Sequence, residues 1–91
     1  MKPLGDPRAH YWRVIGMAQA TGVDLVGAFE TERLSSETWA HMVNRCRACS
    51  CVAGCDRWLA AGNTACVPPR GCENRERFGL LRVEQEMEAC A

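Results

Sequence analysis

The stretch NRCRACSCVAGCDRWLA, residues 44–60, places four cysteines within ten positions. Such a cluster can form disulfides in a secreted mini-protein, hold a metal, or carry out thiol chemistry. The chain has seven cysteines, an odd number that cannot pair completely within one molecule. The N-terminal sequence MKPLGDPRAH lacks the apolar run of a secretory signal, so we predict a cytoplasmic protein, where structural disulfides are rare. We therefore expect a metal site in preference to disulfides.

Length and charge narrow the class of protein. The 91 residues correspond to one domain, and eleven basic side chains balance eleven acidic ones. This balance gives no reason to expect nucleic acid or an anionic membrane as a partner. No stretch approaches the roughly 20 apolar residues of a membrane-spanning helix. We predict a single helical metal-binding domain over residues 1–91, small enough for a metal to stabilise it substantially.

The hydrophobic pattern predicts helices and no strand. A first helix is expected over residues 7–20, because Asp6 can cap it and Pro7 suits the first helical position. Gly22 would end this helix, and further helices are expected after Asp24, from Ser35 or Ser36, over residues 52–61, and over residues 75–89 after an Asn74 cap. The expected apolar positions are Tyr11, Trp12, Ile15 and Ala18; Leu25, Val26 and Phe29; Trp39, Met42, Val43 and Cys46; Cys55, Trp58 and Leu59; and Phe78, Leu80, Leu81, Val83 and Met87.

These elements predict an all-α bundle of four or five helices, stapled by a four-cysteine metal site. Trp39, Met42 and Val43 are expected to be buried together with Ile15 and Phe78. The three tryptophans are expected to build the core, and Trp58 to shield the metal from water as well.

The cysteines lie where helices end or begin. Cys46 continues an apolar face, and a buried free cysteine would explain it alone, but not four cysteines together. Cys49 follows one turn later, and the rigid Pro68-Pro69 segment returns the chain to Cys72. Seven arginines and three carboxylates lie between residues 45 and 82. Arginines and helix N-termini favour thiolates, although a solvated surface explains the arginines equally well.

The order RCRAC, CDRWL and PPRGCEN, behind GDPRAHYW and GVDL, resembles a small cysteine-rich alphaproteobacterial family catalogued as a domain of unknown function. The resemblance covers about residues 4–81. Its pattern, C-x2-C-x5-C-x2-W followed by P-P-x-x-C-x-N, falls on Cys46, Cys49, Cys55, Trp58, Pro68, Pro69, Cys72 and Asn74. The resemblance implies that Cys46, Cys49, Cys55 and Cys72 converge on one centre, with sulfurs within about 7 Å of each other. It leaves Cys51, Cys66 and Cys90 as supernumerary.

Two metals suit this ligand set. The spacing C-x2-C-x5-C resembles the iron–sulfur loops of endonuclease III-type glycosylases and of auxiliary-cluster domains in radical enzymes, which hold a [4Fe-4S] cluster with a fourth cysteine elsewhere. Structural zinc sites more often use two close cysteine pairs. Here sixteen residues separate Cys55 from Cys72. We therefore favour a [4Fe-4S] cluster over Zn²⁺.

Other chemistry has little support in the sequence. We expect His10 and His41 to be surface histidines, and Glu84, Glu86 and Glu88 to be a solvated helix end. An enzyme acting alone is therefore disfavoured, and no small-molecule substrate is indicated. We predict a cytoplasmic iron–sulfur protein that transfers electrons or senses redox state for an unidentified partner protein. The alternative is a zinc-stapled helical adaptor without a redox role.

Overall fold

The computed structural model describes residues 4–89, which form five α-helices and no strand. The helices are α1 (Pro7–Ala20), α2 (Leu25–Glu30), α3 (Ser36–Arg47), α4 (Val52–Ala60) and α5 (Arg75–Ala89). The predicted all-α architecture is confirmed, with helix limits close to those expected. None of the helices in the described part of the chain is long and apolar enough to cross a membrane.

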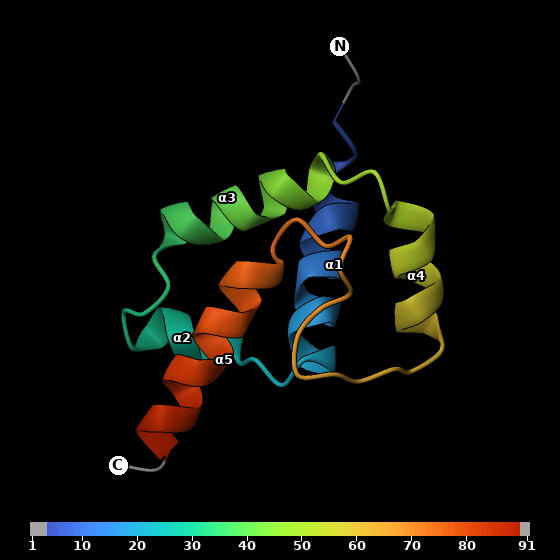
Figure 1. Cartoon of the computed structure of the whole chain (residues 1–91). Coiled ribbons are helices and arrows are strands. Elements are labelled where there is room, and N and C mark those ends of the chain that lie inside the picture. Colours follow the sequence, from blue (N-terminus) through green and yellow to red (C-terminus); the bar gives the residue numbers. More distant parts are fainter. Residues whose placement is uncertain (1–3, 90–91) are drawn as a thin grey trace.

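Helix α1 is the central element, and both α3 and α4 pack against it (Figure 1). The connection between α4 and α5 passes the C-terminal end of α1, where the Ala65 N–H donates to the Ala20 carbonyl (3.1 Å). It then returns toward α3 before α5 begins (Figure 1). This path brings Cys72 back to the end of α3. A return of the chain through the rigid Pro68-Pro69 segment was predicted from the sequence.

Local capping explains where three helices begin. The side chains of Asp6, Asp24 and Ser35 accept hydrogen bonds from backbone N–H groups in the first turns of α1, α2 and α3. Gly22 follows α1 with φ 75°, as expected after a helix end. Asn74 directly precedes α5, as predicted for its cap, and its carbonyl accepts the Phe78 N–H (2.9 Å). Its side chain points elsewhere and donates from Nδ2 to the Met42 carbonyl of α3 (2.7 Å).

The core collects side chains from α1, α2, α3, α5 and the α1–α2 and α2–α3 connections. Its buried apolar members are Val14, Met17, Ala18, Val23, Leu25, Ala28, Leu34, Met42, Phe78 and Leu81. Met42 and Phe78 are therefore buried as predicted. Ile15, Trp39 and Val43 pack against this core but are only partly buried, as is Trp58.

Several predicted core positions are exposed instead. On α1 the buried stripe is His10, Val14 and Met17, so Trp12 lies on the opposite side of the helix and is 63% exposed. Tyr11 is exposed beside it. The same geometry exposes Val26 and Phe29 on α2 and Leu80, Val83 and Met87 on α5, because each helix buries a different stripe. Apolar residues occur on both sides of these helices, so composition alone misidentified the inner face.

Candidate metal centre

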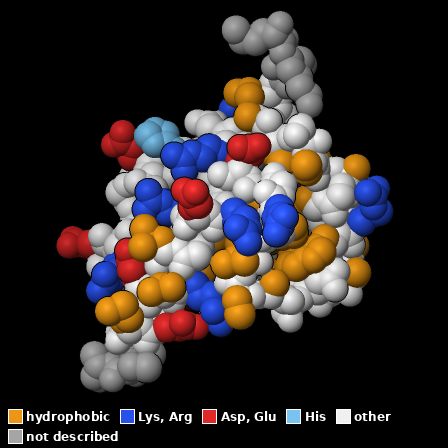
Figure 2. All heavy atoms as spheres, viewed as in Figure 1, with side chains coloured by type: hydrophobic (Ala, Val, Ile, Leu, Met, Phe, Trp, Pro, Cys, Tyr) orange, Lys and Arg blue, Asp and Glu red, His pale blue; other side chains and the backbone are white. Residues whose placement is uncertain are grey.

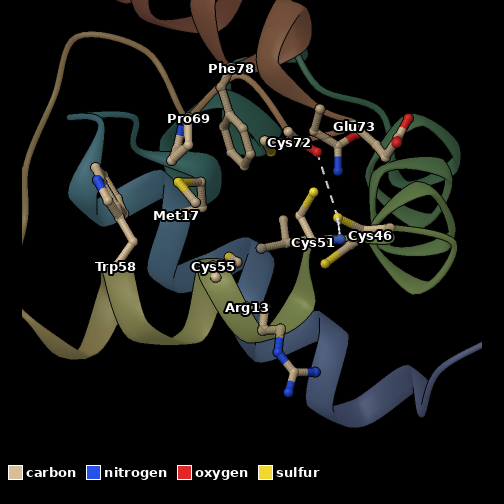
Figure 3. A pocket seen from close by; sticks show the side chains of 15 residues that line it. Arg13, Met17, Cys46, Cys51, Cys55, Trp58, Pro69, Cys72, Glu73 and Phe78 are labelled. Carbon is tan, nitrogen blue, oxygen red and sulfur yellow. Dashed lines mark hydrogen bonds between the residues drawn. The ribbon is translucent and has the colours of Figure 1, made fainter.

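A cavity of about 270 Å³ lies between α1, the end of α3, α4 and the α4–α5 connection. Five cysteines line it: Cys46, Cys49, Cys51, Cys55 and Cys72. Apolar side chains form much of the remaining wall, among them Met17, Trp58, Pro69 and Phe78 (Figure 3). The structure thus brings all four predicted ligands to one hollow, from three separate segments of the chain.

Short turns place these thiols at the cavity. Cys46 lies in the last turn of α3, and the Cys49 N–H donates to its carbonyl (3.1 Å). Cys55 lies in the first turn of α4, where its N–H donates to the Cys51 carbonyl (2.9 Å). A third turn, with the Cys72 N–H donating to the Pro69 carbonyl (3.0 Å), presents Cys72 just before α5. Each thiol is therefore held by the local backbone.

Cys51 also lines the cavity, although the sequence predicted that it would lie apart. Its backbone N–H donates to Cys49 Sγ (3.3 Å), and the Cys49 thiol donates to the Gly71 carbonyl (3.7 Å), the contacts dashed in Figure 3. A Cβ at Gly71 would lie 2.7 Å from Cys51 Sγ, so a glycine is needed for this close approach. Cys66 is exposed and is not among the lining residues, and Cys90 lies outside the described residues.

Three of the four predicted ligands, Cys46, Cys55 and Cys72, have raised pKa values. Burial raises the pKa of Cys46 to about 12, and the neighbouring Cys55, Cys49 and Cys72 contribute to the increase. Burial is also the main cause of the raised pKa of Cys55 and of Cys72. The expectation that these sites favour thiolates is therefore wrong for Cys46, Cys55 and Cys72. Desolvation outweighs the charge of Arg13 at Cys46 and Cys55, and it outweighs the backbone hydrogen bond from Asn74 at Cys72, so the neutral thiol is favoured at all three positions.

Arg13 is the arginine whose charge acts on the site, and it was not among the seven that the sequence singled out. It lines the cavity and lowers the pKa of Cys46 and Cys55, against the larger effect of burial. Its guanidinium binds Asp56 through two hydrogen bonds, Nε to Oδ1 (2.8 Å) and Nη2 to Oδ2 (3.0 Å), and so joins α1 to α4.

Three arginines of the predicted group donate elsewhere. Arg47 binds the Gly5 carbonyl, Arg75 the Pro68 carbonyl and Arg82 the Glu86 carboxylate. The face seen in Figure 2 carries basic, acidic and apolar side chains side by side, in keeping with the balanced composition.

His10 is buried rather than on the surface, which corrects the sequence prediction. It is 4% exposed, and its Nδ1 lies 3.2 Å from Cys46 Sγ. Burial, followed by the charges of Arg13 and Arg47, lowers the pKa of the imidazole. The signal that could have located it is its spacing, since His10, Val14 and Met17 share one helical face. His41 is exposed, as expected.

Residues 1–84 match the model of DUF6455, a family of unknown function. The chain belongs to this family. The matched region of the DUF6455 member contains His10, Arg13 and all five cysteines of the cavity, whereas Cys90 lies beyond it. No curated protein and no solved structure matches the chain.

The donor chemistry of the DUF6455 cavity fits a soft, thiolate-bound metal. Five cysteines and one acidic residue, Glu73, line the cavity. Four cysteine thiolates are the ligand set of both iron–sulfur clusters and structural zinc. Within residues 4–89, no three or more Cys, His, Asp or Glu side chains are already arranged around one ion position. Two backbone groups next to the sulfurs act as donors: the Cys51 N–H donates to Cys49 Sγ, and the backbone of Asn74 lowers the pKa of Cys72.

Proposed function

We propose that the protein binds a [4Fe-4S] cluster through Cys46, Cys49, Cys55 and Cys72, and transfers electrons or senses redox state for a partner protein. One observation carries the proposal: three thiols from residues 46–55 and the distant thiol of Cys72 line one cavity. Four cysteine thiolates are the usual ligands of such a cluster, and its ligands are often spread over loops.

The size and lining of the cavity support a cluster over a single ion. A volume of about 270 Å³ accommodates a group of several atoms. Met17, Trp58 and Phe78 provide apolar walls, and an apolar shell limits the access of water to a metal centre and tunes its potential. Trp58 lies one turn after Cys55 on α4 and lines the cavity, which supports a role in shielding the cluster from water.

The protein's own residues supply ligands, charge and hydrogen bonds. Once the thiols lose their protons, Arg13 offsets part of the negative charge that they acquire. The backbone N–H of Cys51 donates to Cys49 Sγ, and that of Asn74 interacts with Cys72. A bound [4Fe-4S] cluster supplies one-electron chemistry, and these contacts are the kind that adjust its reduction potential.

A zinc-stapled adaptor is the second candidate, and an exposed aromatic surface favours it. The rings of Tyr11 and Phe29 pack around Trp39, with centroids 6.2 Å and 5.9 Å from its own, and Trp12 lies edge-on to Tyr11. Trp12 is 63% exposed and Phe29 46% exposed. Aromatic clusters of this kind are enriched at protein interfaces.

Metal and sulfide analysis after anaerobic purification tests the proposal. We expect a brown protein with equal amounts of iron and acid-labile sulfide. Cys72→Ser should lose both, whereas the exposed Cys66→Ser should keep the wild-type content. A colourless protein with one zinc per chain would instead support the adaptor, and a protein without either metal would reject both candidates.

A further inference from the structure

His10 contacts a predicted ligand from outside the cavity. Its Nδ1 lies 3.2 Å from Cys46 Sγ, and the residue is 4% exposed, although it is not among the residues that line the hollow. His10 comes from the first turn of α1 and Cys46 from the last turn of α3. The contact therefore joins α1 to α3 at Cys46 Sγ, through a residue that does not line the cavity.

The segment before α1 fixes the ring against Cys46. The Gly5 N–H donates to the Arg47 carbonyl (3.1 Å), and Arg47 Nε donates to the Gly5 carbonyl (2.8 Å). A Cβ at Gly5 would lie 2.1 Å from His10 Nε2. The imidazole is thus held between Gly5 on its Nε2 side and Cys46 on its Nδ1 side.

The chemistry of a bound thiolate sets the direction of this hydrogen bond. A metal-bound cysteine sulfur has no proton and can only accept, so the ring must carry its proton at Nδ1. Added electron density on a metal centre is partly delocalised onto its sulfur ligands, and a hydrogen bond to sulfur stabilises the reduced form more than the oxidised form.

We propose that His10 is a positioning residue that donates from Nδ1 to the Cys46 sulfur and raises the reduction potential of the centre. This inference rests on the proposed function. His10 contacts Cys46 Sγ but is not among the residues that line the cavity, so it acts through Cys46 and not as a ligand.

Reduction midpoints of the reconstituted protein test this role. His10→Leu replaces the imidazole with an apolar side chain of similar size and removes the donor. It should shift the midpoint to a more negative value at unchanged iron and sulfide content. His10→Asn should stay closer to wild type, because its amide can place an N–H where Nδ1 lies. His41→Leu is the matched control and should have no effect, since His41 is exposed.

Gly5→Ala gives a second route to the same result without altering His10. The added methyl group collides with Nε2 and displaces the ring, so the midpoint should fall in the same direction as for His10→Leu. Gly16→Ala is its control, because a Cβ there meets Leu59 only at ordinary contact distance (3.7 Å).

A direct measurement on the wild-type protein covers the case in which His10→Leu does not fold. Nitrogen-15 NMR of the loaded protein should find the His10 proton at Nδ1, and a proton at Nε2 alone would overturn the proposal. Equal midpoints for wild type and a folded, fully loaded His10→Leu would also overturn it. If the wild-type protein takes up no iron and sulfide, that measurement alone rejects the proposed function, and the proposed role of His10 is rejected with it. Failure of the proposed function is therefore distinguishable from failure of the His10 proposal, which appears only in loaded protein, as unchanged midpoints or a proton at Nε2 alone.

Discussion

At the scale of single residues, Asn74 links two helices through one buried hydrogen bond. Its side chain is 1% exposed and donates to the Met42 carbonyl, in the middle of the core. We expect Asn74→Ala to lower the free energy of unfolding by about 1–3 kcal/mol, the usual cost of a buried hydrogen bond lost with its partner left in place. Urea denaturation would measure it.

Asn63→Ala is the matched control for this prediction. Asn63 also donates from Nδ2 to a backbone carbonyl, that of Trp58, but it is exposed, and water can replace the bond. Its substitution should change stability by less than about 0.5 kcal/mol. Equal losses for the two variants would show that the bond to Met42 contributes no more than a surface contact.

Residues whose partners are local were predictable, and residues whose partners are distant were not. Asp6 and Asp24 cap the turns that follow them, and this is readable from the chain. His10 meets Cys46 across 36 positions and Arg13 meets Asp56 across 43. No local pattern encodes such pairs. The sequence therefore named four of the five cysteines that line the cavity, but it missed the positions of His10 and Arg13 beside them.

At the scale of elements, α4 is the least anchored helix. None of its described residues is buried, and only side chains such as Cys55, Trp58 and Leu59 are partly covered. The double hydrogen bond between Arg13 and Asp56 ties it to α1. This helix therefore depends on one ion pair, on partial apolar contacts and, in our proposal, on a ligand bond through Cys55.

Arg13→Met should consequently loosen α4 more than the rest of the protein. We expect a loss of about 0.5–1 kcal/mol, because both partners are partly exposed to solvent. Amide hydrogen exchange should accelerate in α4 and remain unchanged in α5. Arg82→Met, which removes an ion pair within α5 itself, is the control and should leave α4 unaffected. Uniform acceleration along the chain would contradict the proposed role of the ion pair.

The existence and limits of the helices followed from the sequence, but their inner faces did not. Caps and proline residues act locally and mark helix ends. The face of α5 that turns inward is decided by Phe78 and Leu81 meeting the core, while Leu80, Val83 and Met87 remain exposed on the same helix. Such a choice depends on the partners that a helix meets, and these belong to the tertiary structure.

At the scale of the whole molecule, the chain divides into a packed part and a thiol-bearing part. Helix α5 is joined to the α2 region by Gln85, which exchanges hydrogen bonds with the Asp24 backbone, and by the ion pair of Arg33 with Glu88. The buried apolar core lies in this packed part. Residues 48–73 contribute Pro68 as a buried side chain, and otherwise mainly the walls of the cavity.

Metal should therefore supply folding energy chiefly to residues 48–73, since a bound metal adds its binding free energy to the stability of the segment that it links. Cys49→Ser and Cys72→Ser should lower metal content and the melting temperature together, by about 4–8 °C for each kcal/mol lost in a domain of this size. Hydrogen exchange should accelerate most in α4 and the α4–α5 connection, while α5 keeps its protection through Phe78 and Leu81.

Cys90→Ser is the control and should leave metal content and melting unchanged, because Cys90 lies beyond the matched region of the family. A Cys72→Ser protein with full metal content and unchanged melting, alongside a Cys90→Ser protein that loses both, would refute the ligand set.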